Sequence, residues 1–166
     1  VENKAFRKVP DNANTAVNIL ADVVLDPKLS SKYVWSIVSE NSTGLYYIGV
    51  CYEHKAKAAT FTGGENWQEL GHGHFTFGNK GYVDNSFDKA NNGKQRDFTL
   101  DDSIPQSLTI DFRHETLSIA QHGKMIHKMP VPMPKSGEIL RPVLWIPGNN
   151  KGIFKIGSFK VNKVEP

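Results

Sequence analysis

Alternating hydrophobic and polar side chains are the main pattern of this chain. In KYVWSIVSE, Tyr33, Trp35 and Ile37 fall on one face of an extended chain, and the residues between them fall on the other. A period of two is typical of a β-strand with a buried face, because successive side chains point to opposite sides. We therefore predict a strand here with Trp35 in the core, followed by a tight hairpin at NSTG.

The same period continues through LTIDFRHETLSIAQHGKMIHKMPVP, residues 108–132. Its RHE and QHGK pieces are typical of turns, and Gly123 supplies a left-handed backbone in the second of them at little cost. We therefore predict consecutive hairpins. Their inward-facing side chains are Leu108, Ile110, Phe112, Leu117 and Ile119.

Three more strands are predicted from apolar runs. LYYIGVCYE is apolar on both faces, and ILRPVLWIP and GIFKIGSFKV close the chain around the turn GNNKG. PVPMPKSG is too rich in proline for a central strand and is predicted to be an extended connection. Many short strands with frequent turns indicate an all-β fold, a two-sheet antiparallel β-sandwich.

The N-terminal region fits this pattern less directly. DNANTAVNILADVV, residues 11–24, has apolar side chains at helical spacing with Asp11 or Asn12 as a cap, and it also reads as an apolar strand. We expect one short N-terminal helix or a strand here. We treat 1–22 as an N-terminal extension or linker and 23–162 as the sandwich domain. The opening Val in place of Met indicates a fragment or a processed chain.

Composition narrows the class of protein. With 166 residues, 39% hydrophobic and 22% charged, the chain suits one globular domain. The net charge of +3 comes from scattered lysines, so nucleic-acid binding is not predicted. No apolar run reaches the roughly 18 residues of a membrane helix. The single cysteine, Cys51, has no internal disulfide partner, which favours a buried thiol and an intracellular, cytoplasmic location.

The histidines do not predict a metal site. His114 and His122 lie in turns at opposite ends of a strand of about six residues, roughly 20 Å apart, which Zn–N bonds of about 2 Å cannot bridge. His127 follows on the next strand. His72 and His74 in GHGH share a side if extended, and adventitious metal binding is the most that this pair suggests.

Acid–base catalysis is not predicted either. Hydrolysis of a glycosidic bond needs two facing carboxylates, whereas Asp101 and Asp102 are adjacent and diverge in an extended chain. Asp111 is a single acid on the polar face of its strand. No nucleophile, zinc-protease or phosphate-loop motif is present. We therefore expect a protein that is not an enzyme.

The order of the pieces resembles the SPRY domain, found alone or as PRY-SPRY. VLDPKLSS is similar to the LDP segment of PRY-SPRY proteins, and YVWSIVSE followed by YYIGVCYE resembles the family's Trp and "hGV" strands. SLTIDFRHETLSIAQHGKMIHKM is similar to its late hairpin, and LRPVLWIPGNNKGIFKI to its L-x-P strand. The chain departs from the pattern where LDP lies too close to the Trp strand for a complete PRY half. A divergent SPRY domain is the hypothesis, and another concanavalin-like jelly roll is the alternative.

This resemblance implies a bent sandwich that binds proteins through loops at one end, without catalytic residues or a cofactor. Such modules are appended to ubiquitin ligases, channels or signalling scaffolds, where they act as adaptors or in substrate recognition. The resemblance thus implies a protein or peptide partner and a monomeric domain.

Function is expected in the Gly- and Asn-rich stretch from Lys57 to Phe98, because long polar loops between short strands commonly carry binding sites. Aromatic and Arg side chains are enriched at interface hot spots. If loops 52–70 and 79–97 converge at one end, they would form a groove. The alternative is a lectin-like sandwich in which Trp67 stacks on a sugar beside Glu65 and Asn66. The predicted partner-binding residues are Tyr52, Trp67, Tyr82, Phe87, Arg96, Trp145 and Asn149.

Overall fold

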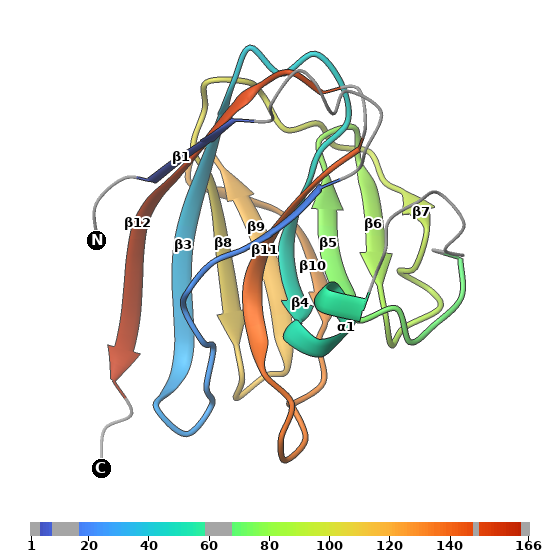
Figure 1. Cartoon of the computed structure of the whole chain (residues 1–166), viewed down its shortest axis with the longest axis vertical. Coiled ribbons are helices and arrows are strands. Elements are labelled where there is room, and N and C mark those ends of the chain that lie inside the picture. The colour runs from blue at the N-terminus through green and yellow to red at the C-terminus, as the bar shows by residue number, and fades with distance from the viewer. Residues whose placement is uncertain (1–3, 8–16, 59–67, 148–149, 164–166) are drawn as a thin grey trace.

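The computed structural model describes residues 4–7, 17–58, 68–147 and 150–163. Within them the chain forms two antiparallel sheets packed face to face, with one short helix at the end of β4 (Figure 1). The elements are β1 (Lys4–Arg7), β2 (Val17–Leu20), β3 (Ser30–Glu40), β4 (Tyr47–Tyr52), α1 (Glu53–Ala58), β5 (His74–Gly78), β6 (Tyr82–Asn85), β7 (Lys94–Gln95), β8 (Gln106–Asp111), β9 (Thr116–Gln121), β10 (Lys124–Pro130), β11 (Leu140–Ile146) and β12 (Ile153–Lys163).

The strands are shared equally between the sheets. The first sheet has the order β1-β12-β3-β8-β9-β10, and the second has the order β2-β11-β4-β5-β6-β7. The β8-β9-β10 meander is the run of hairpins predicted from the alternating pattern, with turns at 112–115 and 122–123. His122 and Gly123 both have positive φ angles, +53° and +71°, as the second tight turn requires.

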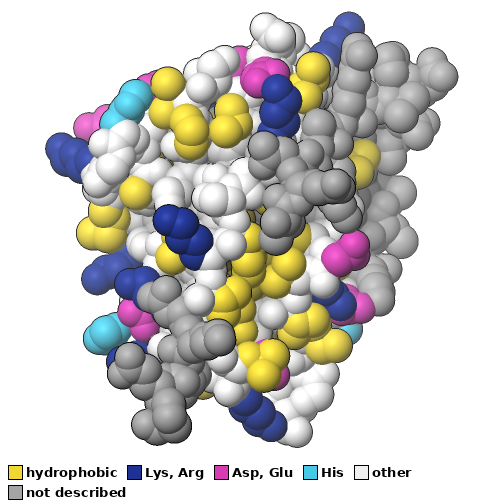
Figure 2. Space-filling view, turned by 90° about the vertical axis from the view of Figure 1, so that its left-hand side faces the viewer, with side chains coloured by type: hydrophobic (Ala, Val, Ile, Leu, Met, Phe, Trp, Pro, Cys, Tyr) yellow, Lys and Arg dark blue, Asp and Glu magenta, His cyan; other side chains and the backbone are white. Residues whose placement is uncertain are grey.

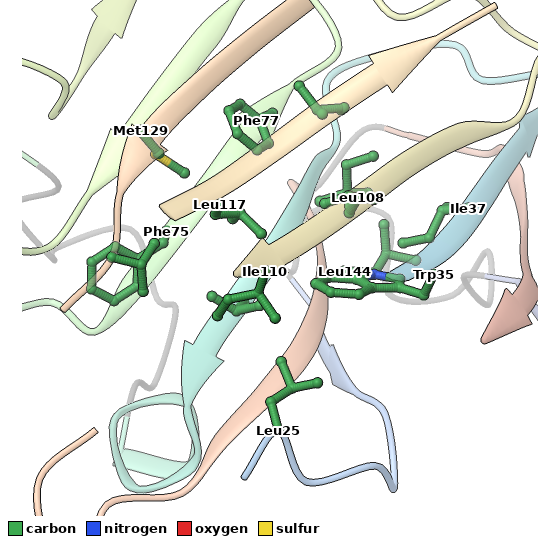
Figure 3. Packing of buried hydrophobic residues seen from close by; sticks show 14 of the residues in the cluster. Leu25, Trp35, Ile37, Phe75, Phe77, Leu108, Ile110, Leu117, Met129 and Leu144 are labelled. Carbon is green, nitrogen blue, oxygen red and sulfur yellow. The ribbon is translucent and has the colours of Figure 1, made fainter. Parts of the chain in front are cut away.

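The core lies between the two sheets (Figure 3). Trp35 from β3 is 1% exposed and lies beside Leu144 from β11 of the opposite sheet, and Phe77 from β5 belongs to the same core (Figure 3). Tyr33 and Ile37 are buried on the same face of β3. The prediction from the period of two is therefore confirmed for this strand, and likewise for the inward positions of β8 and β9.

Strand β4 is apolar on both sides because both of its faces are covered. Ile48 and Val50 point into the main core. On the other side, Cys51 packs with Val143 from β11 and Ala56 from α1 in a second, smaller cluster. The helix thus shields part of the outer face of the second sheet, and its apolar contact explains why the strand pattern is not alternating.

The N-terminal region is extended where it is described. Helical spacing suggested a helix over 11–24, but Val17–Leu20 form strand β2, paired with β11. Residues 11–16 of that segment lie outside the described residues. Pairing with β11 determines the conformation of this segment. As a strand it forms hydrogen bonds with the edge of β11, whereas a short isolated helix would leave that edge unpaired. The 4–7 segment likewise pairs with β12.

Figure 2 shows a narrow apolar band on one side of the molecule. Ile19 from β2 and Ile156 from β12 line a small hollow together with Ile37 and Leu144. Ile19, Ile156 and Phe159 are partly buried and pack against the main core. They close the open side of the sandwich. In the described part of the chain, no helix is long and apolar enough to cross a membrane.

Candidate binding surface

Two loops converge at the end of the sandwich where β4 ends and β5 begins. Gly71 N donates to Ser86 O at 2.7 Å, and Gly73 N donates to Ser86 Oγ at 2.7 Å. Segments 68–73 and 85–92 therefore lie side by side. Segment 85–92 belongs to the loop 79–97, whereas Gly71 and Gly73 follow the loop 52–70, of which residues 59–67 lie outside the described part of the chain.

Two buried asparagines fix the second of these loops. Asn85, 0% exposed, accepts from the backbone N–H groups of Phe87 and Asp88 through Oδ1, and its Nδ2 donates to Pro130 O at 2.7 Å. Asn92 Oδ1 in turn accepts from Asn85 N at 3.0 Å. A loop held through so many bonds has little conformational entropy left to lose when it binds a partner.

This rigid frame exposes two large hydrophobic side chains. Phe87 is 64% exposed and Leu70 is 49% exposed. Because residue 71 bonds residue 86, the two positions lie on adjacent backbone segments. We call segments 68–73 and 85–92, with these two side chains, the Phe87 patch. An exposed aromatic on a fixed loop is the kind of anchor that interfaces use.

Arg96 supports the far side of the same loop. Its Nη2 donates to Ala90 O at 2.8 Å and lies 3.3 Å from Asn91 Oδ1. The guanidinium is exposed and retains further N–H donors for a partner. Arg96 thus lies beside the patch.

Trp145 and Tyr82 lie elsewhere, on the outer face of the second sheet. Trp145 is directly opposite Tyr47 on β4, with ring centroids 4.6 Å apart. Val143 shares its face, as predicted, so Trp145 is outside the main core and only partly buried. Tyr82 begins β6 and is also partly buried. Tyr82 is opposite Gln95 on β7, next to Arg96, whose backbone N donates to Gly81 O at 2.8 Å.

Tyr52 is a core residue. It is 8% exposed, and its ring meets that of Phe75 edge-on at 5.9 Å. We therefore leave it out of the binding surface. Trp67 and Asn149 lie outside the described residues, as do Glu65 and Asn66 of the lectin alternative.

The paired histidines of GHGH are part of the hydrogen-bond network behind the patch. His72 Nδ1 accepts from His74 N, so its Nε2 carries the proton and donates to Asn92 Oδ1 at 2.9 Å. His74 Nδ1 faces His72 O, and Nε2 accepts from Asn18 Nδ2 at 3.1 Å. Burial lowers the pKa of His74 to about 4. Both rings are neutral at pH 7 and are engaged in structure.

The three histidines of residues 108–132 have separate partners. His114 Nδ1 lies 3.0 Å from Asp111 Oδ2, and His122 Nε2 lies 3.7 Å from Asp101 Oδ2. His127 stacks on Phe98 with centroids 5.9 Å apart. Among the described residues, no group of three or more His, Cys, Asp or Glu side chains could hold a metal ion.

Asp84 is the most perturbed acid of the second sheet. It is 7% exposed, and burial raises its pKa to about 6, opposed by hydrogen bonds from Thr76 and the Gly93 backbone. Thr76 Oγ1 lies 3.4 Å from Asp84 Oδ2. Acids with a shifted pKa can mark functional sites. In a glycosidase a second carboxylate nearby would contribute to the shift, whereas the pKa of Asp84 is raised by burial.

Cys51 is a buried thiol, as predicted. It is 0% exposed, and burial raises its pKa to about 12. Because the thiolate is the reactive form, we expect no labelling by a disulfide reagent such as dithionitrobenzoate in the native protein at pH 8. One equivalent should react after unfolding in urea. Rapid labelling of the native chain would contradict this placement.

Several residues that shape the surface were not predicted from the sequence. Asn85 and Asn92 looked like generic loop residues, and Leu70 had no pattern to mark it. The Asn85-Ser86-Phe87-Asp88 order is compatible with an Asx turn, in which an asparagine caps the backbone two residues later. That local signal could have identified Asn85, whereas the role of Asn92 depends on contacts with a distant loop.

Comparisons with known proteins identify the fold. No family model and no curated protein matches the sequence. Among solved structures, a human SPRY domain matches with 15% identity and a TM-score of 0.58, over 93% of this chain and 96% of that one. The SPRY domain of human HERC1 matches with 13% identity and a TM-score of 0.54, over 86% and 82% of the two chains. Stonustoxin matches with 14% identity and a TM-score of 0.57, over 84% of this chain and 20% of its own.

The chain therefore has the SPRY fold, and the predicted two-sheet sandwich is confirmed. Because identity is this low, the likeness concerns the arrangement of the backbone.

Proposed function

We propose that this protein is a non-catalytic interaction module that holds a peptide or protein surface at the Phe87 patch. The observation that carries the proposal is Phe87 itself, a 64% exposed aromatic side chain on a loop fixed by buried Asn85. Protein interfaces typically have an apolar centre surrounded by a polar rim. The Phe87 side chain and the polar loop backbone around it have this arrangement.

The anchor would insert into an apolar pocket of the partner, with Leu70 beside it and Arg96 donating at the rim. Binding of this kind needs no metal or cofactor and no turnover. We further propose that the module works inside the cell as a monomeric adaptor or substrate-recognition part of a larger protein, for example a ubiquitin ligase. The SPRY fold supports this setting because one similar structure is the SPRY domain of human HERC1, which is one domain of a named protein.

A peptide-display selection against the immobilised full chain tests the proposal. Enriched peptides should lose at least tenfold in affinity on Phe87→Ala, since hot-spot truncations cost about 2 kcal/mol or more. Met125→Ala is the matched control, because Met125 is 56% exposed on the β10 edge. Thermal unfolding should be nearly unchanged in both variants. Peptides that bind all three proteins equally would place the site elsewhere.

A further inference from the structure

A second concave surface lies between the connection that precedes β3 and the connection from β10 to β11. Residues 24–28 form one wall and residues 134–139 the other, around a volume of about 440 Å³. This volume is within the range of roughly 300–1,000 Å³ typical of ligand sites. The groove shares no residue with the Phe87 patch.

The walls of this groove are apolar and open to solvent. Val24 is 39% exposed and Ile139 is 40% exposed, and Pro27 and Pro134 add rigid apolar surface. Leu25 forms the base and is 1% exposed. Apolar side chains that face solvent within a hollow can gain from burial against a ligand, at about 25 cal/mol per Å².

One wall is fixed in place by a tyrosine. Tyr33 Oη donates to Asp26 O at 2.8 Å and accepts from Asp26 N at 3.2 Å. The same carbonyl accepts from Leu29 N and Ser30 N. The turn that carries Pro27 and Lys28 is therefore preorganised.

The other wall is a tight turn closed by its own side chain. Glu138 Oε2 accepts from Lys135 N at 2.7 Å, and Glu138 N donates to Lys135 O at 3.0 Å. Gly137 has a φ of +85°, which the turn requires and which other residues rarely adopt. Both walls thus keep their shape before a ligand arrives, which lowers the entropic cost of binding.

The charges of the groove are arranged asymmetrically. Asp26 Oδ1 accepts from Lys28 N at 2.8 Å, so both carboxylates of the groove, Asp26 and Glu138, are turned to their own backbone. Lys28 and Lys135 are exposed, and neither ammonium group forms an ion pair within the described part of the chain. Two free cations therefore border an apolar hollow.

We propose that this groove binds an acidic peptide segment. One apolar side chain of the peptide lies between Val24 and Ile139, and neighbouring carboxylates reach Lys28 and Lys135. The site is separate from the Phe87 patch, so the module can hold one partner at two points or two different partners.

The test uses the ¹⁵N-labelled full chain and the probe acetyl-Glu-Asp-Leu-Asp-Glu-amide. In NMR titrations, we expect shifts of the backbone amides of residues 24–28 and 134–139. The double variant Lys28→Glu, Lys135→Glu should bind at least tenfold more weakly, and Ile139→Ser should weaken binding several-fold. Raising the salt from 50 to 300 mM should also weaken it, because exposed charges are screened.

Three controls make the result decisive. Lys124→Glu carries the same single charge reversal at the β9–β10 turn, remote from the groove, and should leave the affinity unchanged. A probe with Ser in place of Leu should bind at least fivefold more weakly, and one with Lys in place of its acids should not bind. Three outcomes would overturn the proposal. The basic probe could bind more strongly than the acidic one, Lys124→Glu could weaken binding as much as Lys135→Glu does, or the amide shifts could be confined to the Phe87 patch. Phe87→Ala leaves the groove intact. Loss of binding to the display-selected peptides in that variant therefore tests the Phe87 patch alone and does not bear on the acidic-peptide groove.

Discussion

Replacing Asn150 with alanine is expected to lower the free energy of unfolding by about 3 kcal/mol. The side chain is 2% exposed, and its Nδ2 donates to Ser42 Oγ at 2.8 Å and to the carbonyls of Gly44 and Leu45 at 3.1 Å each. Its Oδ1 accepts from Gly152 N at 2.8 Å. Ser42, Gly44 and Leu45 are partly buried, and Gly44 O keeps a hydrogen bond from Asn79 Nδ2 at 3.0 Å. The loss therefore combines several hydrogen bonds, at about 1 kcal/mol each, with the cost of about 1–3 kcal/mol for leaving the buried Gly152 N without its acceptor.

Urea unfolding at pH 7 measures the effect. Thr43→Ala is the local control, because Thr43 is exposed and its Oγ1 accepts from Lys151 N at 3.2 Å in the same region. We expect that control to cost less than 1 kcal/mol. Equal losses for the two variants would mean that Asn150 does not join the β3–β4 hairpin to the β11–β12 connection.

The same position shows where sequence reasoning stops. GNNKG marks a turn, and Asn149 was selected from it as a binding residue, but Asn149 lies outside the described residues. Its neighbour Asn150 is the buried one, and it bonds carbonyls about 105 positions away in sequence. No local pattern tells which of two adjacent asparagines faces a distant hairpin.

Strands were predictable where the local pattern and the tertiary environment agree. In β3 and β8 one face meets the core and the other meets solvent, so the period of two is visible in the sequence itself. The prediction was wrong where distant contacts decide. Helix α1 was not foreseen, because its sequence EHKAKA is short and mostly polar, and Ala56 packs against Cys51 and Val143 on the outer face of the second sheet.

The candidate surfaces follow the same division. Phe87 was selected from the sequence because it is an aromatic side chain in a long polar loop, and aromatic side chains are enriched at interface hot spots. Its neighbour Leu70 and the groove between Val24 and Ile139 depend on which loops lie side by side. That placement is set by hydrogen bonds between remote segments, such as Gly71 to Ser86, and not by local spacing.

Replacing Asp84 with asparagine is expected to stabilise the protein by about 2 kcal/mol at pH 7.5. The pKa of Asp84 is raised from 3.8 to about 6 because burial penalises the carboxylate. A shift of about two units corresponds to about 3 kcal/mol at a pH above both values. Asparagine has no charge to bury and keeps an oxygen that accepts from Thr76, while its new N–H donors reduce the gain.

The sign of this effect fixes its pH dependence. A raised folded-state pKa means that the contribution of Asp84 to stability is fully present below about pH 4 and is lost as the pH rises through 6. The advantage of Asp84→Asn should therefore disappear between pH 6 and 4 in urea unfolding, leaving the variant about 1 kcal/mol less stable at pH 4 because the cost of its N–H donors remains. Asp97→Asn, at an exposed position, is the control and should change stability by less than about 0.5 kcal/mol throughout.

His74 makes this prediction sharper, because its titration has the opposite sign. Its folded-state pKa of about 4 lies below the ordinary 6.5, so stability is lost as the pH falls from 6.5 to 4. In the natural chain, the gain from protonating Asp84 offsets that loss over nearly the same range. The Asp84→Asn variant lacks the offset, so it should be the more stable protein at pH 7.5 and yet lose stability more steeply on acidification. Parallel stability curves for the two proteins would show that Asp84 titrates normally in the folded state.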